Sequence, residues 1–183
     1  SLYPMTLSKG FWIHGTTQIK KYMLKDDNTF DLNEATTSFT IGKLFVAPSG
    51  YYAIAEDNNF KRYFIDSNLQ EYRNTALDGG NLALTDTLII KQTSNDSGGF
   101  VLWKSSAVKN ATFVKIDEKT EDYTVSGVSI TPDNSVLIMN STQTYITDPI
   151  EIASYTGLSP STFRISTTNV PSEVTLSKDG LLY

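Results

Sequence analysis

Residues Leu44–Ile54 read LFVAPSGYYAI, an apolar run, a short Ala-Pro-Ser-Gly segment and a second apolar run. Proline fixes φ near the value that the first position of a tight turn requires, and glycine tolerates the positive φ that such a turn needs near its end. The aromatic and β-branched residues on both sides favour strands. The stretch therefore predicts two antiparallel strands joined by a tight turn.

Similar strand–turn–strand units recur at intervals of roughly 36 to 48 residues, a range typical of one four-stranded propeller blade. The other copies are Met5–Ile13 (MTLSKGFWI), Val128–Ile138 (VSITPDNSVLI), Val174–Tyr183 (VTLSKDGLLY) and a degenerate one, Asn81–Ile90 (NLALTDTLII). The pattern resembles the strand–SPDG–strand opening of WD40-like and related β-propeller blades. The WD dipeptide and the GH signature are absent, so no subfamily follows.

The rest of the chain is also typical of a β protein. Thr, Tyr, Phe, Val and Ile are abundant, turn residues interrupt them at short intervals, and no long window has helical apolar spacing. We predict an all-β fold, a small β-propeller-like ring of about four to five antiparallel blades. The alternative is a β-sandwich or jelly roll with chance turn similarities. The clearest expected strands are Phe11–Ile19, Tyr51–Ala55, Tyr63–Ile65, Thr87–Lys91, Phe100–Lys104, Val136–Met139 and Thr144–Thr147.

The ends of the sequence bear on domain organisation. The chain begins with one turn-and-strand unit and stops just after another begins. We expect residues 1–183 to form a single propeller-like domain excised from a longer chain, either closed by pairing of its ends or left open.

Composition excludes several classes of function. The chain is 39% hydrophobic and 19% charged, which is ordinary for a folded domain, and no apolar run reaches the roughly 20 residues of a membrane span. A net charge of −5 with scattered basic residues disfavours nucleic acid and anionic membranes as partners. The absence of cysteine removes disulfides, thiolate catalysis and cysteine-ligated zinc.

Catalytic constellations are weak. His14 is the only histidine, it lacks a G-x-S-x-G elbow to pair with, and we interpret it as a surface or interface residue. The acidic groups Glu56–Asp57 and Asp117–Asp122 are interpreted as solvated loop residues and not as a glycosidase pair. The chain is therefore predicted not to be an enzyme.

The segment Ser94–Gly98, followed by Trp103, resembles a loosened Asp-box, the S-x-D-x-G-x-x-W hairpin of sialidase-type propellers. The tryptophan falls two residues later than that motif places it. An Asp-box is a structural turn, so the resemblance is taken as support for the fold alone. Arg62, Arg73 and Arg164 would numerically permit a sialidase-like arginine triad, but the chain is short for such an enzyme.

Calcium is the cofactor that the sequence favours. Residues 26–34 place oxygen-bearing side chains at alternate positions, and we name Asp27, Asp31 and Asn33 as candidate metal ligands. The glycine of an EF-hand loop is missing, because Leu32 follows Asp31. The competing interpretation is a polar hairpin between Leu24 and Phe39.

Aromatic residues are the remaining candidates for binding. Trp12, Trp103 and tyrosines such as Tyr51, Tyr52, Tyr63 and Tyr72 could stack on sugars or anchor a protein, although most are expected in the core. No residues of a ligand-binding face are assigned.

In size, composition and small-propeller character the chain is similar to the distal heads of spike proteins from marine, membrane-containing bacteriophages. This resemblance implies a non-enzymatic attachment domain on a virion or other extracellular surface, within an oligomeric spike, that binds a host-surface glycan or receptor with calcium. The alternatives are a scaffold fragment of a larger propeller and a propeller glycosidase.

Overall fold

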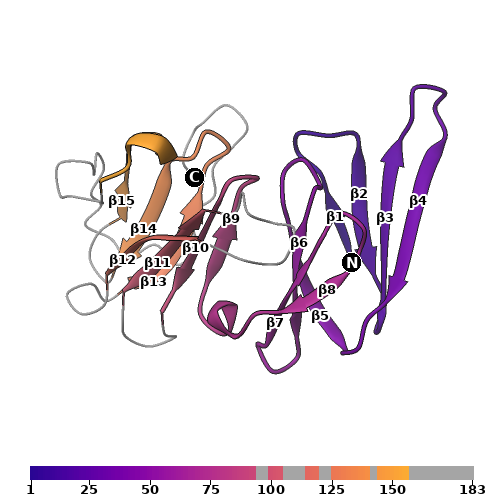
Figure 1. Ribbon diagram of the computed structural model, residues 1–183, viewed down its shortest axis with the longest axis horizontal. Coiled ribbons are helices and arrows are strands. Elements are labelled where there is room, and N and C mark those ends of the chain that lie inside the picture. The colour runs from indigo at the N-terminus through magenta and orange to yellow at the C-terminus, as the bar shows by residue number, and fades with distance from the viewer. Residues whose placement is uncertain (94–98, 105–113, 120–124, 141–143, 157–183) are drawn as a thin grey trace. The chain divides into compact units, whose positions relative to one another are not determined.

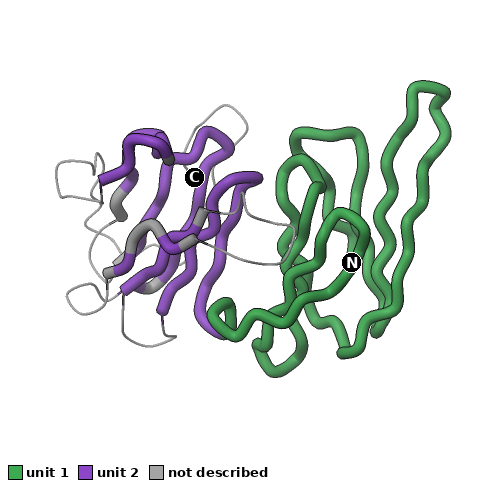
Figure 2. Tube along the Cα trace, in the orientation of Figure 1, with its two compact units in different colours: residues 1–78, 107–112 green, residues 79–106, 113–183 purple. Residues whose placement is uncertain are grey.

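The computed structural model describes residues 1–93, 99–104, 114–119, 125–140 and 144–156. They form strands and two short 3-10 helices, and these described residues divide into two compact units, Ser1–Asp78 and the described residues from Gly79 onward (Figures 1 and 2). Among the described residues, no helix has the length and apolar character that crossing a bilayer would require.

Unit 1 contains two four-stranded antiparallel sheets in which the strand order equals the sequence order. We call them sheet A and sheet B. Sheet A consists of β1 (Leu2–Pro4), β2 (Gly10–His14), β3 (Gln18–Leu24) and β4 (Phe30–Thr36). Sheet B consists of β5 (Ile41–Val46), β6 (Ala53–Asp57), β7 (Arg62–Ile65) and β8 (Glu71–Arg73), and the 3-10 helix η1 (Thr75–Leu77) follows it.

Unit 2 repeats the same plan, with a four-stranded and a three-stranded antiparallel sheet. The first consists of β9 (Leu82–Leu84), β10 (Leu88–Gln92), β11 (Phe100–Lys104) and β12 (Val114–Lys119). The second consists of β13 (Val125–Ile130), β14 (Val136–Asn140) and β15 (Thr144–Ile146), and the 3-10 helix η3 (Ile152–Ser154) lies near the end of the described chain.

Each unit has its own hydrophobic core between its two sheets. In unit 1, Trp12 and Ile19 of sheet A are buried with Leu44, Ala55 and Ile65 of sheet B. In unit 2 the corresponding cluster joins the four-stranded sheet to β13 and β14, and its members include Leu88, Ile90, Leu102, Val128, Val136 and Ile138. Because alternate residues of a strand point to opposite faces, these clusters define which face of each sheet is covered.

The repeated turns have the conformation that their sequence predicts. Gly50 ends the Ala47–Gly50 turn at φ 74°, and Asn134 ends the Thr131–Asn134 turn at φ 69°. In both turns the last residue donates its backbone N–H to the first residue's carbonyl oxygen, over 2.8 Å and 3.0 Å. Glycine and asparagine are the residues that accept this left-handed geometry most readily.

Two details differ from the sequence-based expectation. The predicted strand Phe11–Ile19 is two strands, because a turn at residues 15–17 separates β2 from β3. The polar segment Phe30–Thr36, part of which was the candidate calcium loop, is a full strand, β4, although nearly all of its residues are exposed. Its pairing with β3 fits the competing interpretation of a polar hairpin between Leu24 and Phe39. The repeat copy Val174–Tyr183 lies outside the described residues.

Candidate binding surface

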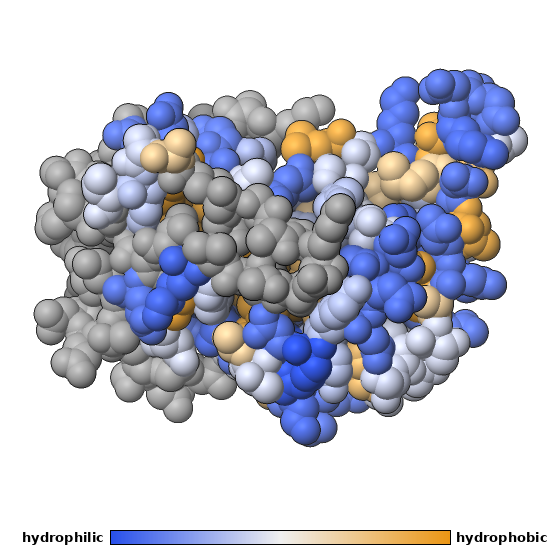
Figure 3. All heavy atoms as spheres, viewed as in Figure 1, coloured by the Kyte–Doolittle hydropathy of each residue, from blue (hydrophilic) through white to orange (hydrophobic). Residues whose placement is uncertain are grey.

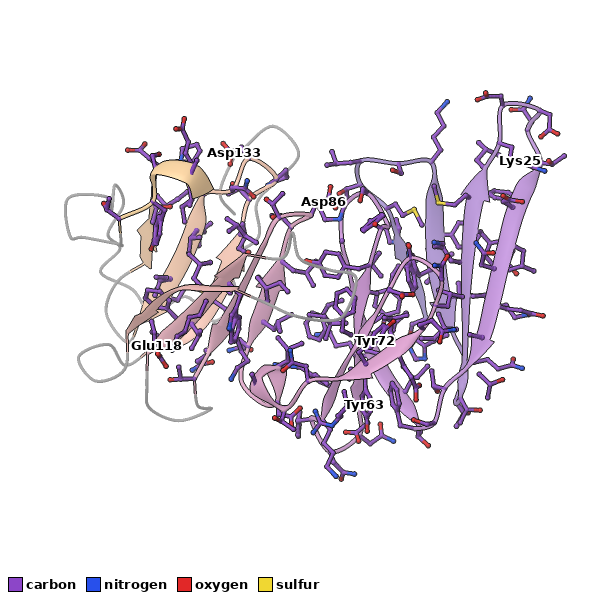
Figure 4. The ribbon with its side chains drawn as sticks, in the orientation of Figure 1. Lys25, Tyr63, Tyr72, Asp86, Glu118 and Asp133 are labelled. Atoms are coloured by element: carbon purple, nitrogen blue, oxygen red, sulfur yellow. The ribbon has the colours of Figure 1, made fainter. Side chains whose placement is uncertain are left out.

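Three hairpin loops meet at one end of unit 1, and we call this group the hairpin end. It comprises residues 5–9, 25–29 and 47–52, which join β1 to β2, β3 to β4 and β5 to β6. The Leu7 N–H donates to the carbonyl oxygen of Pro48 over 2.9 Å, so backbone hydrogen bonding links the first and third loops. The Leu24 N–H donates to the Lys9 carbonyl oxygen over 2.8 Å and links the first and second. Figure 4 labels Lys25 in the β3–β4 hairpin.

A buried methionine, Met5, packs against the turn of the third loop. Met5 is only 6% exposed, and its Sδ atom would lie 2.3 Å from a Cβ atom added to Gly50. Only glycine therefore lets the Ala47–Gly50 turn approach Met5 this closely, and its positive φ adds a second requirement for glycine. The loops are consequently fixed by packing as well as by hydrogen bonds.

Large apolar side chains remain exposed on these fixed loops. Leu7 is 63% exposed and Tyr51 is 56% exposed. By contrast Tyr52, the next residue, is fully buried and stacks on Phe64 at 5.2 Å between ring centroids. Of the tyrosines that the sequence suggested, Tyr51 is thus the one presented to solvent at a loop. An exposed aromatic ring on a rigid backbone can contact a ligand at little entropic cost.

The calcium candidates lie near the hairpin end but not all in it. Asp27 is in the β3–β4 loop, and its Oδ1 accepts hydrogen bonds from the Thr29 N–H at 2.9 Å and the Thr29 hydroxyl at 2.6 Å. These bonds hold the pKa of Asp27 below its usual value. Asp31 and Asn33 follow in β4, where both are exposed although the register places them on the face of sheet A that also carries Trp12. Within the described ranges no group of three or more His, Asp or Glu side chains is arranged to hold a metal ion, and calcium binding stays a prediction.

Other carboxylates have structural partners. The Asp57 carboxylate accepts hydrogen bonds from the N–H groups of Asn59 and Lys61, and Asp66 caps an equivalent turn through Asn68 and Gln70.

Of the second acidic group, Asp117 and Glu118 lie in β12, where Glu118 pairs with Lys115 at 2.6 Å. Its remaining members, Glu121 and Asp122, lie outside the described residues, as do the Asp-box-like Ser94–Gly98 and Arg164.

Two arginines of unit 1 are engaged in a network that the sequence did not reveal. The Arg62 side chain is 3% exposed; it pairs with Glu56 at 2.8 Å and donates to the Leu77 carbonyl oxygen at 2.8 Å. Arg73 binds Asp78 through both guanidinium nitrogens, at 2.7 Å and 2.6 Å. Partial burial raises the pKa of Asp78, but hydrogen bonds from Arg73 and from the Arg62 N–H outweigh it and hold the pKa below its usual value.

A buried lysine is a second feature that sequence analysis missed. Lys21 is 7% exposed, donates from Nζ to the Ser67 carbonyl oxygen at 2.6 Å, and lies 5.6 Å from the Trp12 ring centre. Burial lowers its pKa, and the nearby charge of Asp66 opposes this effect. His14 shares its face of sheet A, donates from Nδ1 to the Gly15 carbonyl oxygen and stacks on Tyr3. His14 is half-buried and held by these local contacts, whereas the sequence-based interpretation was a surface or interface residue.

The Neurospora crassa Pan2 WD40 domain superposes with a TM-score of 0.62 over 97% of this chain and 56% of its own length, at 11% identity. The chain has the fold of a partial β-propeller. The N-terminal domain of Nup159 superposes with a TM-score of 0.51 over 93% of this chain and 51% of its own, also at 11% identity.

A third similar structure is the dihydro-heme d1 dehydrogenase NirN in complex with DHE. It has a TM-score of 0.57 at 14% identity, over 97% of this chain and 39% of its own length. The chain thus spans between 39% and 56% of these structures. No protein-family model and no curated protein matches the sequence. The propeller prediction is confirmed over the sandwich alternative, and identities this low establish the fold alone.

Proposed function

We propose that this chain is a non-enzymatic recognition domain of a surface protein, such as a viral spike, and that its hairpin end binds a host-surface glycan or receptor. The observation that carries the proposal is the exposure of Tyr51 and Leu7 on loops that hydrogen bonds and Met5 hold in place. Soluble domains expose large apolar side chains singly, whereas two of them on one rigid loop end are suited to contact a ligand.

The chemistry of the hairpin end suits a glycan. The Tyr51 ring offers a flat face for the C–H face of a sugar, and Asp27 and Lys9 place an acceptor and a donor group on neighbouring exposed loops. Calcium would enter through Asp27, Asp31 and Asn33, beside the contact residues. In this proposal the domain works on a virion or other extracellular surface, within an oligomeric spike, without nucleic acid and without membrane insertion.

Structural roles for three of the described carboxylates support binding over glycoside hydrolysis. Glu56 neutralises a buried arginine, and Asp57 and Asp66 fix turns, so each has a structural role in place of a catalytic one. A glycosidase would instead require two carboxylates facing each other across a cleft.

The test is binding of the labelled domain to a broad glycan array, once with calcium and once with a chelator. Tyr51→Ser and Leu7→Ser should each weaken selective binding at least about fivefold, as expected for anchor residues. Phe60→Ser is the matched control, because Phe60 is 59% exposed on the β6–β7 hairpin, at the opposite end of sheet B.

Loss of binding in chelator would support calcium at or near the site. Binding that survives both substitutions would reject the hairpin end as the site. A cooperatively folded sample that binds nothing under either condition would reject the glycan version and leave a protein receptor to be sought.

A further inference from the structure

Sheet B covers one face of sheet A within unit 1. The covered face carries Trp12 and Ile19 against sheet B. The strand register places Pro4, Phe11, Tyr22 and Leu32 in a row on the opposite face, which we call the outer face of sheet A.

The outer face is apolar although no described residue of sheet B covers it. Leu2, Phe30 and Leu32 point to it and are 60%, 50% and 46% exposed. They are half of the six large hydrophobic side chains that are exposed in the described chain. Figure 3 shows hydrophobic side chains at the surface along the β4 side of unit 1.

Aromatic packing makes this face pre-organised. Phe11 stacks on Tyr22 with 4.8 Å between ring centroids, and Phe30 meets both rings edge-on at 5.7 Å and 6.0 Å. The three rings come from three successive strands, so their positions are set by the register of the sheet. A partner would meet a surface whose side chains lose little further freedom on binding.

The charge of the outer face is balanced. Within its strands the charged side chains are Lys20 and Glu34, which face each other across β3 and β4 with 3.4 Å between Nζ and Oε2. The chain as a whole carries −5, so two copies repel each other over most orientations. A contact through this neutral, apolar face is one that two copies can make without adding repulsion at the interface.

We propose that the outer face of sheet A packs against the same face of a second copy of this chain. The inference goes beyond the proposed recognition function and does not depend on it. β3 and β4 have seven residues each, so the sheet is about 23 Å long and, with four strands, about 19 Å wide. This footprint of roughly 400 Å² per copy is below that of a standard stable interface, so the dimer forms reversibly at high concentration.

The test is sedimentation equilibrium of the whole chain over a wide concentration range. Wild type should show a monomer–dimer equilibrium, and Leu32→Lys should weaken it at least about thirtyfold, as expected for charging the centre of an apolar contact. Leu7→Lys is the matched control: the same substitution at a residue that is 63% exposed but lies in the β1–β2 loop, off the outer face. It should leave the equilibrium unchanged.

A second pair of variants separates lost dimerisation from lost folding. Lys20→Glu gives each outer face a net negative charge and should weaken the dimer at low salt, with partial recovery at high salt as repulsion is screened. Lys61→Glu makes the same change in charge at an exposed residue of the β6–β7 hairpin of sheet B and should have no effect. A misfolded variant would not be rescued by salt.

The outcomes are decisive in both directions. Weakening by Leu32→Lys and Lys20→Glu, with unchanged controls, supports the interface. A wild type that stays monomeric at the highest concentration reached would overturn the proposal and point to a different sheet as the occupant of this face. A dimer that none of these variants affects would overturn it too, because its interface would lie elsewhere.

Discussion

Replacing Arg62 with methionine tests whether the buried ion pair holds sheet B to the segment that follows it. Arg62 and Glu56 have side chains only 3% and 12% exposed, and Arg62 Nε also donates to Glu56 Oε2 at 2.9 Å. Removing the guanidinium leaves Glu56 without its counter-charge in a largely buried site and removes a donor from the Leu77 carbonyl oxygen. Breaking one side of such a pair costs about 3–5 kcal/mol, a large part of the stability of an ordinary domain.

The comparison that isolates this cost is Arg73→Met. The Arg73–Asp78 pair is close, at 2.6 Å, but its side chains are 31% and 32% exposed, so water screens it and we expect a loss of about 1 kcal/mol or less. The double variant Glu56→Met with Arg62→Met should recover most of the loss, because it leaves no buried charge unpaired and replaces the pair with apolar packing.

The assay is urea unfolding followed by circular dichroism, with midpoints and slopes compared among the four proteins. Equal losses for Arg62→Met and Arg73→Met would refute the claim that burial decides the value of these pairs. A double variant as unstable as Arg62→Met alone would show that the guanidinium contributes by packing and by its bond to Leu77 and not by neutralising Glu56.

Two matched pairs of turn variants follow from the backbone, both measured by urea or thermal unfolding. Gly50→Ala should lower the unfolding free energy by at least about 1 kcal/mol more than Gly79→Ala does. Both glycines have positive φ, but only at Gly50 would the new Cβ meet Met5. Equal losses of unfolding free energy would contradict this reasoning. Phe60→Gly should stabilise by about 0.5–1 kcal/mol, because Phe60 sits at φ 61° and is largely exposed. Leu69 has a similar φ of 62° but is only 5% exposed, so Leu69→Gly should instead destabilise the protein by about 1–2 kcal/mol through lost apolar burial. A change in unfolding free energy of the same sign for both variants would refute the claim that burial decides the outcome at these two positions.

The turns of the fold were accessible from sequence because their chemistry is local. Pro48 and Gly50 fix the backbone of their loop almost independently of the rest of the chain, and Thr131–Asn134 does the same. Strand β4 was accessible only through the competing interpretation of a polar hairpin, because its residues are polar and exposed and only pairing with β3 makes them a strand. The turn at residues 15–17 was missed for a related reason: β2 and β3 are both rich enough in apolar residues to be taken for one strand.

The candidate binding surface was accessible only in part. Sequence analysis named Tyr51 among several tyrosines, but it could not separate Tyr51 from the buried Tyr52, since the two differ only in which way the end of the turn points them. Leu7 was not named at all. Its role depends on a hydrogen bond to Pro48, which is distant in sequence, and no local pattern encodes such a contact.

Strand order bears on how the chain acquires its structure. In all four sheets each strand pairs with the strand next to it in sequence, so each pairing closes a short loop. Short closures cost little entropy and favour fast folding, whereas Greek-key sheets must wait for distant segments to meet. During synthesis, sheet A can form all its hydrogen bonds once Thr36 has emerged, before any of sheet B exists. The chain is thereby suited to fold in order from its N-terminus, with the first sheet of each unit giving the second a surface on which to condense.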